Sequence, residues 1–421
     1  MADGQLFTLA PRVAQLRRSP TAAISDRIRE LTEKGRTVVN LGEGELDFDT
    51  PAHIKDAAHR AIERGETKYT SVAGTRELKQ AILRKFEQEN GISYRTTEVI
   101  AGPGAKSLIL NALLATVSEG DEVIVPAPYW VSYPDMVALA GGTPRIVPCS
   151  EHAGWKLSAE SLVEAITPHT KWLILNSPNN PTGATYSAAD LKKLADVLLK
   201  HPHVLVLSDD IYEHILYDCP FATLVQVEPR LRERTLVVNG VSKAYSMTGW
   251  RLGFAAGPQK LVDALEVLQS QSTSNPSSIS QAAAAHALEA GTDFMDQWRD
   301  VLRIRRDVVV STLSQTPGLR VAAPEGAFYA FINCAGLLGA VRHDGLLIES
   351  DFEVTNYLLD EAGVGVVHGA AFGASPYFRV AYAIETDVLR RACDAIQAAC
   401  IRLVSSQPTR RSDTGAQAKI G

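Results

Sequence analysis

The stretch KWLILNSP, residues 171–178, is one of several short apolar runs that decide the fold. Amphipathic segments such as SAADLKKLADVLLKHP, residues 187–202, separate these runs. Continuous runs of Val, Ile and Leu between helices are typical of strands that are buried on both faces. The pattern therefore predicts an α/β fold with a mainly parallel sheet covered by helices. The other runs are DEVIVPAP (121–128), HVLVLSDD (203–210), TLVVNGVS (235–242) and RLGFAAG (251–257).

The pattern of predicted strands and helices changes after a long helical stretch at about 293–316. AFYAFINC (327–334), VGVVHG (364–369) and YFRVAYA (377–383) resemble strands of a smaller α+β unit, which the helical segment 385–404 closes. We predict a large domain at 51–318 and a small domain that combines residues 12–50 with 319–405. Residues 406–421 show no apolar periodicity, which predicts a flexible tail.

Composition excludes several classes of protein. The net charge is −6, from 42 basic and 48 acidic residues, and the lack of a basic block argues against a nucleic-acid partner. No 18-residue apolar run and no signal peptide are visible, which predicts a cytoplasmic protein without a membrane span. The five cysteines are scattered, without a CxxC or Cys/His cluster, so we predict reduced, mostly packed thiols and no metal site.

Polar residues gather where the predicted strands end. HVLVLSDD ends near Asp209, with Tyr212 three residues later, and the other runs are followed by Trp130, Asn180 and Lys243. In open α/β sheets, ligands bind beyond the carboxyl ends of the strands. We therefore expect these side chains to converge on one edge of the sheet. The turn EVIAGPGAKS (98–107) opens a helix whose N-terminus suits a phosphate, although it lacks the spacing of a Walker loop.

This set of side chains matches the needs of pyridoxal 5′-phosphate. The cofactor requires a lysine that forms a Schiff base, a carboxylate that keeps the pyridine nitrogen protonated, and donors for its phenolate oxygen and phosphate. Taken alone, Lys243 would be an ordinary surface lysine and Arg251 part of a structural ion pair. The neighbouring residues favour a functional interpretation of both.

Eight motifs, in this order, resemble the fold-type I, class I aminotransferases that depend on pyridoxal 5′-phosphate, especially bacterial aspartate aminotransferases. The resemblance extends from Arg12 to Val404. The motifs are GELDFDTP (44–51), KYTSVAGTREL (68–78), PAPYWVSYP (126–134), NSPNNPTG (176–183), SDDIYEH (208–214), SKAYSMTGWRLGF (242–254), PEGAFYAF (324–331) and FRVAYA (378–383).

The resemblance implies a catalytic role for three of these residues. Lys243 would form the Schiff base and, once released, move a proton through a quinonoid intermediate. Asp209, rather than its neighbour Asp210, would face the pyridine nitrogen. Tyr212 would hydrogen-bond the phenolic oxygen together with Asn180, and the peptide between Asn180 and Pro181 would be cis.

The remaining site residues also follow from the resemblance. Trp130 would stack on the cofactor ring, and Arg251 would bind the phosphate together with backbone N–H groups of Gly104, Ala105 and Lys106. Tyr69 would reach the phosphate of the neighbouring subunit, which implies a homodimer with shared active sites. The substrates would be an amino acid and a keto acid acceptor, contacted by Gly44, Glu43, Arg379, Asn180 and Trp130.

Glu43 departs from the aspartate aminotransferase pattern, in which a small residue precedes the glycine, and Leu46 replaces a proline. A glutamate here resembles 1-aminocyclopropane-1-carboxylate synthases, which act on S-adenosylmethionine. An alternative function is therefore γ-elimination, replacement or ring formation on a cationic substrate. Glu43 should point into the substrate-facing mouth, with Lys106, a water network or such a substrate as its partner. A non-catalytic sensor is a further alternative, but it would carry an N-terminal helix-turn-helix domain, and only about a dozen residues precede the resemblance.

Overall fold

Seven strands form the central sheet in a computed structural model that describes residues 9–14, 16 and 20–405. Every neighbouring pair is parallel except those of β8, which is antiparallel to β2 and to β7. The predicted mainly parallel sheet is confirmed. The strand order is β2 (Val99–Gly102), β8 (Gly253–Ala256), β7 (Thr235–Gly240), β6 (Leu205–Asp209), β5 (Thr170–Asn176), β3 (Glu122–Ala127) and β4 (Thr143–Pro148).

The reversed direction of β8 follows from its connection to β7. Residues 241–252 contain only a short 3₁₀ turn, Thr248–Trp250, and no α-helix. A parallel neighbour usually requires a crossover helix, whereas an antiparallel neighbour needs only a return of the chain. The same connection carries Lys243 and Arg251.

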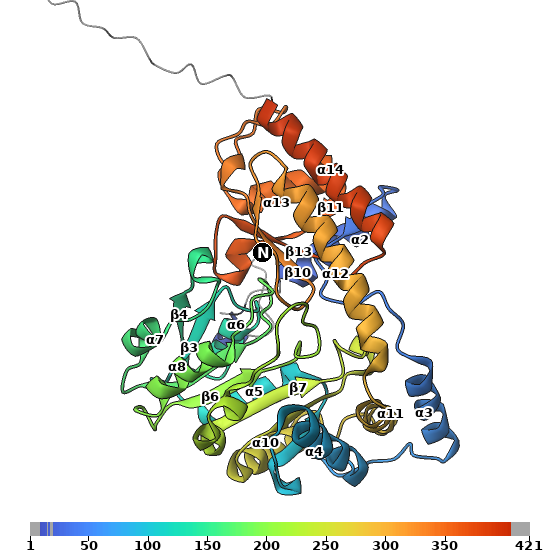
Figure 1. Cartoon of the computed structure of the whole chain (residues 1–421), viewed down its shortest axis with the longest axis vertical. Coiled ribbons are helices and arrows are strands. Elements are labelled where there is room, and N and C mark those ends of the chain that lie inside the picture. Colours follow the sequence, from blue (N-terminus) through green and yellow to red (C-terminus); the bar gives the residue numbers. More distant parts are fainter. Residues whose placement is uncertain (1–8, 15, 17–19, 406–421) are drawn as a thin grey trace, which may run out of the picture.

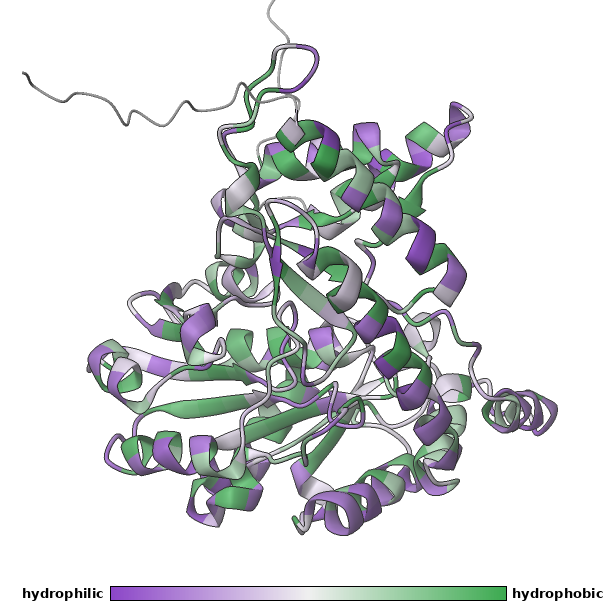
Figure 2. Ribbon diagram, turned by 45° about the horizontal axis from the view of Figure 1, so that its top comes forward, coloured by the Kyte–Doolittle hydropathy of each residue, from purple (hydrophilic) through white to green (hydrophobic). Residues whose placement is uncertain are grey.

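Alternate residues of each strand pack against helices on opposite faces of the sheet. Trp172 and Ile174 of β5 lie in one apolar cluster with α5 (Ala105–Thr116), whereas Leu173 and Leu175 lie in another with α8 (Ala188–Leu198). Figure 2 shows the hydrophobic strands between helices whose outer sides are hydrophilic. Burial on both faces explains why the strand sequences are continuously apolar. The other helices around the sheet are α3 (Ala52–Glu63), α4 (Arg76–Asn90), α6 (Tyr133–Leu139), α7 (Ala159–Ala165), α9 (Leu224–Val227), α10 (Gln259–Gln271) and α11 (Ser278–Glu289).

A smaller unit stands above the large sheet and combines an N-terminal with a C-terminal segment of the described chain (Figure 1). Its antiparallel sheet has the order β12 (Val367–His368), β13 (Tyr377–Ala381), β10 (Tyr329–Asn333) and β9 (Arg320–Val321). β1 (Val39–Asn40) pairs in parallel with β11 (Val364–Gly365), which joins the N-terminal segment to the C-terminal one. The helices α2 (Pro20–Glu33), α12 (Asp293–Ser314), α13 (Asp351–Glu361) and α14 (Thr386–Ser405) pack against these strands, whereas α1 (Pro11–Ala14) contacts α6.

The domain boundaries at 50/51 and 318/319 stay a prediction, and the expected tail at 406–421 lies outside the described residues. All five cysteines are free thiols, and Cys393 and Cys400 are buried on α14. Within the described part of the chain, no helix has both the length and the apolar character that crossing a membrane requires.

Candidate active site

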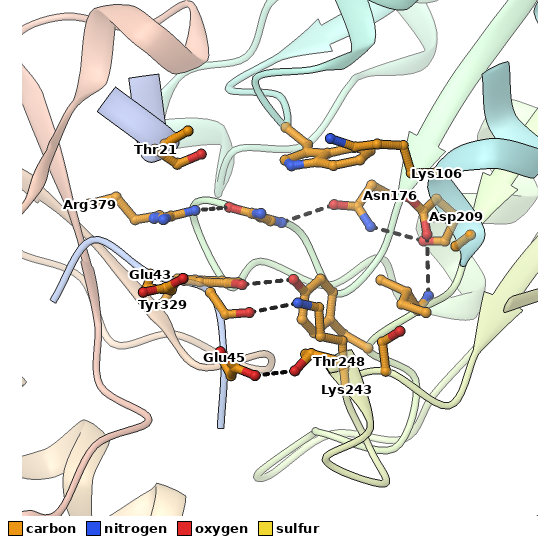
Figure 3. A pocket seen from close by; sticks show the side chains of 18 of the residues that line it. Thr21, Glu43, Glu45, Lys106, Asn176, Asp209, Lys243, Thr248, Tyr329 and Arg379 are labelled. Carbon is orange, nitrogen blue, oxygen red and sulfur yellow. Dashed lines mark hydrogen bonds between the residues drawn. The ribbon is translucent and has the colours of Figure 1, made fainter. Parts of the chain in front are cut away.

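A cavity of about 600 Å³ lies where the carboxyl ends of β5 and β6 meet the smaller unit. Every residue predicted for the site lines it, except Gly104 and Tyr69. Figure 3 shows Lys243 and Thr248 opposite Glu43 and Glu45, with Arg379 at one end and Lys106 near the other. The strand-end rule therefore predicted the location of the cavity, because the ends of parallel strands share one edge.

Lys243 follows β7 and points across the cavity. Its Nζ donates a 2.6 Å hydrogen bond to the carbonyl oxygen of Gly44. Burial, helped by the positive charges of Arg379 and Arg251, lowers the pKa of Lys243 to about 8. Since the neutral amine is the nucleophile, this lysine is prepared to attack a carbonyl carbon at neutral pH.

Asp209 is the last residue of β6, and its side chain is buried at the cavity wall. Tyr133 donates a 2.6 Å hydrogen bond to Oδ2, and the backbone N–H of Ile211 lies 3.4 Å from Oδ1. Burial raises the pKa of Asp209 to about 6, although the Tyr133 hydrogen bond acts against it. A cationic group beside this carboxylate would favour its ionised form.

Asp210 is also buried but does not line the cavity. Its Oδ1 accepts a 2.8 Å hydrogen bond from Ser208, and burial raises its pKa to about 7. The geometry favours Asp209 over Asp210 as the residue that faces a ligand.

A cradle for an anion is formed where α5 begins. Gly104 has a positive φ of 90°, and a Cβ there would lie 2.6 Å from Nη2 of Arg251. Only glycine therefore lets the guanidinium approach this turn. Nη1 of Arg251 donates a 2.8 Å hydrogen bond to the carbonyl of Thr248, and within the described chain Arg251 has no carboxylate partner. α5 begins at Ala105, directly after this turn, and the first N–H groups of a helix have no partner within it and can bind an anion, as in phosphate sites.

Arg379 is a buried cation at the other end of the cavity, only 2% exposed. Nη1 donates a 2.9 Å hydrogen bond to Oδ1 of Asn180, and Nη2 contacts the carbonyl of Gly42. The guanidinium lies 4.6 Å from the ring centre of Tyr329, and its Nε has no hydrogen-bond partner among the described residues. A buried guanidinium without a carboxylate partner is costly unless a ligand supplies the anion.

Asn180 and Tyr212 lie between these two ends. Asn180 contacts Arg379, and the Tyr212 hydroxyl lies 2.8 Å from that of Tyr329. Burial raises the pKa of Tyr212 well above its ordinary value, so the phenol stays a donor. The expected cis peptide between Asn180 and Pro181 is wrong. The cis bond of this loop joins Ser177 to Pro178, three residues earlier.

Glu43 lines the cavity at its exposed mouth, and its protein partner is Asn40 rather than Lys106, one of the three expected partners. Nδ2 of Asn40 donates a 3.2 Å hydrogen bond to Oε2 of Glu43. The ammonium of Lys106 instead lies 4.7 Å from the ring centre of Trp130, and burial followed by the charge of Arg251 lowers its pKa. Glu43 is thus exposed rather than buried. Its carboxylate contacts Asn40 and does not form an ion pair with Lys106.

Tyr69 is 92% exposed and does not line the cavity of its own chain. Its side chain is therefore not part of the active site of its own chain. The expectation that Tyr69 serves a neighbouring subunit stays a prediction.

Several residues that line the cavity were not predicted from the sequence, among them Glu45, Tyr133, Asn176 and Tyr329. Asn176 ends β5 and donates a 2.9 Å hydrogen bond to the backbone carbonyl of Asp209, so the strand-end rule could have found it. Tyr133 lies within the quoted motif PAPYWVSYP, yet nothing in the motif points to Asp209. Tyr329 and Glu45 are likewise inside quoted motifs.

The residues fit pyridoxal 5′-phosphate. The Gly104 cradle with Arg251 suits a phosphate, Lys243 suits an aldehyde, and buried Asp209 suits a protonated ring nitrogen at the same cavity. Arg379 is not required for the cofactor and is therefore available to bind a substrate carboxylate.

Comparisons with known proteins agree with this geometry. The family model described as "Aminotransferase class I and II" matches residues 36–396. The chain is 52% identical to an aspartate/prephenate aminotransferase of Cereibacter sphaeroides over 396 residues, 94% of this chain and 99% of that relative. The crystal structure of aspartate aminotransferase from Rhizobium meliloti matches with a TM-score of 0.92 and 51% identity, covering 94% of this chain and 100% of that one. The Thermus thermophilus aspartate aminotransferase with maleate matches with a TM-score of 0.88 and 39% identity, again over 94% and 100%.

Proposed function

Because the chain belongs to the aminotransferase class I and II family, we propose that it transfers the amino group of aspartate to a keto acid that also carries a second carboxylate. It is an aminotransferase of fold type I that uses pyridoxal 5′-phosphate. Its relatives support transamination and not the elimination or ring-forming chemistry that Glu43 suggested. The substrate pair is our proposal.

Two separate cations in one cavity support the proposal of a dicarboxylic substrate. Arg379 is buried without an acidic partner at one end, and Lys106 has a lowered pKa beside Trp130 near the other. A dicarboxylic amino acid supplies one anion to each cation, whereas a monocarboxylic one leaves Lys106 unpaired. The relatives named above are aspartate or aspartate/prephenate aminotransferases, and the Thermus thermophilus structure contains maleate, a dicarboxylate.

We propose the following roles for the residues of the cavity. The bound cofactor supplies an aldehyde for the substrate amine and a conjugated ring that delocalises the electron pair left at Cα. Lys243 anchors the cofactor and, when released, takes the proton from Cα. Asp209, held by Tyr133, keeps the proton on the ring nitrogen, and the Gly104 turn with Arg251 holds the phosphate. Arg379 and Asn180 orient the α-carboxylate so that the Cα–H bond faces Lys243.

We further propose a homodimer in which Tyr69 completes the phosphate site of the neighbouring subunit. The 92% exposure of Tyr69 supports this arrangement. A cytoplasmic location stays our prediction from the sequence.

The substrate proposal is tested by steady-state kinetics with amino donors that differ only in their distal group. We expect aspartate to exceed alanine in kcat/KM by about a hundredfold, the value of a desolvated charged hydrogen bond. Lys106→Met should remove most of that preference and leave alanine unchanged, so alanine serves as the internal control. Equal kcat/KM for the two donors in the wild-type enzyme would overturn the dicarboxylate assignment.

A further inference from the structure

A buried ion pair lies behind the turn that carries Asp209 and Tyr212. Lys85, on α4, is 2% exposed, and its ammonium contacts Oε1 of Glu213. The ammonium also donates a 2.7 Å hydrogen bond to Oδ1 of Asn90, and Nδ2 of Asn90 donates a 3.0 Å hydrogen bond to Oε2 of Glu213. The three side chains form a closed ring, here called the Lys85–Asn90–Glu213 triad. No residue of this triad lines the active-site cavity.

Burial of the triad costs free energy, because two charged groups lose their contact with water. Burial alone raises the pKa of Glu213, but the charges of Lys85 and His214 and the hydrogen bonds from Lys85 and Asn90 together hold the pKa below its ordinary value. Two buried charges seldom stabilise a fold more than apolar side chains of similar size do. Fixed geometry is the gain that such a pair offers over apolar packing.

The position of Glu213 shows which geometry the triad fixes. Its backbone N–H donates a 2.9 Å hydrogen bond to the carbonyl of Asp210, and the N–H of Asp210 donates one of 2.9 Å to Val238 on β7. Asp209 and Tyr212 line the cavity, whereas Asp210 and Glu213 do not. The turn is therefore attached to α4 by Glu213 and presents Asp209 and Tyr212 to the active site.

We propose that the Lys85–Asn90–Glu213 triad positions Asp209 and Tyr212 for catalysis. The inference rests on the roles that the proposed function gives to these two residues. If the turn is displaced, the Asp209 carboxylate moves away from the ring nitrogen. Catalysis is sensitive to displacements of about 1 Å in the groups that contact the reacting molecule.

Glu213 also belongs to a group of possible metal ligands, but this group is not arranged to bind a metal ion. Glu89, Glu213 and His214 have ligand atoms within 4.8 Å of one another. However, the Lys85 ammonium contacts Glu213 and lies 3.5 Å from Oε2 of Glu89, so a positive charge already sits between the two carboxylates. Nε2 of His214 lies 2.8 Å from that same Oε2.

The test replaces the charges of the triad in the holoenzyme. Lys85→Met/Glu213→Gln removes both charges of the buried pair, and Glu89, which loses its contact with Lys85, keeps its contact with His214. Asn90→Ala removes one side of the ring while both charges remain. The matched control is Arg84→Met/Glu289→Gln, which removes an exposed ion pair that starts from the same helix. The measurements are kcat, KM, the melting temperature and the pH midpoint of the bound cofactor's absorbance.

We expect kcat of the double variant to fall between about ten- and a hundredfold and KM to stay nearly unchanged. The substitutions displace groups that act in the chemical step and leave the substrate-binding residues in place. The pH midpoint should shift as well, and Asn90→Ala should show the same effects to a smaller degree. The control should match the wild type. Wild-type kcat and midpoint in the triad variants, whatever their melting temperatures, would overturn the proposal. If Asp209→Asn itself leaves kcat unchanged, the proposed role of Asp209 fails instead, so the two failures are distinguishable.

Discussion

The hydroxyl of Tyr133 donates a 2.6 Å hydrogen bond to Oδ2 of Asp209, which joins α6 to the end of β6. Both side chains are buried, and they lie 76 positions apart in the sequence. The hydrogen bond favours the ionised carboxylate, whereas burial opposes it. Tyr133 therefore sets how readily Asp209 can balance a protonated ring nitrogen.

Tyr133→Phe should raise the pKa of Asp209 above about 6, because burial then acts without the opposing hydrogen bond. The carboxylate would become neutral at a higher pH, so the acidic limb of the kcat profile should shift upward and kcat near pH 7 should fall by about tenfold. Tyr357→Phe is the control, since its hydroxyl donates a 2.9 Å hydrogen bond to the Ala399 carbonyl away from the cavity. An unshifted acidic limb in Tyr133→Phe would contradict the assignment.

Lys243→Ala should abolish turnover and leave the fold intact, because the amine that anchors the cofactor is removed. Borohydride reduction followed by mass spectrometry measures covalent attachment. The wild-type enzyme should retain the cofactor on Lys243 after reduction. Attachment in the variant at any other lysine would show that the nucleophile has been misassigned.

Cofactor uptake by the enzyme stripped of pyridoxal 5′-phosphate should depend on pH through Lys243. The lowered pKa of about 8 means that the reactive neutral amine increases as pH rises through 8, so the uptake rate should increase there. Glu45→Gln should move the midpoint down, because Glu45 raises the pKa, and Arg379→Met should move it up, because Arg379 lowers it. Rapid-mixing absorbance from pH 6.5 to 9.5 measures the rates. Shifts in the same direction for both variants would refute this electrostatic account.

Mixing two inactive variants tests whether Tyr69 acts across a dimer interface. Lys243→Ala and Tyr69→Ala homodimers each lack a complete site if the site is shared. After subunit exchange, a hybrid dimer contains one site with neither substitution, so activity should reappear. Exchange is verified by affinity tags of two kinds on the two variants. Verified hybrids without activity would show that each site is built within one chain.

Glu43→Ala should raise kcat/KM for aspartate by about two- to fivefold, because it removes an exposed negative charge from the cavity mouth. The gain should shrink at high salt, since screening already weakens the charge in the wild type. The absorbance of the bound cofactor should not change, because Glu43 bonds Asn40 and none of the proposed cofactor ligands. A gain of equal size for alanine would indicate a change in the loop rather than a charge effect.

Much of the site was predictable because strand ends are local features of the sequence. Lys243, Asp209 and Trp130 each follow a short apolar run, and a parallel sheet places such positions on one edge without any knowledge of packing. Arg379 was predictable for a similar reason, since an arginine within an apolar strand requires an anion.

Contacts between distant elements required the tertiary structure. The Tyr133–Asp209 hydrogen bond and the contact of Glu213 with Lys85 and Asn90 both depend on how helices and loops pack around the sheet. The sequence by itself determined the α/β architecture and the edge where the catalytic groups lie, because periodicity and strand polarity are local. Only the tertiary structure decided which polar atoms pair there, because backbone turns and side-chain directions are set by packing that joins residues far apart in the chain.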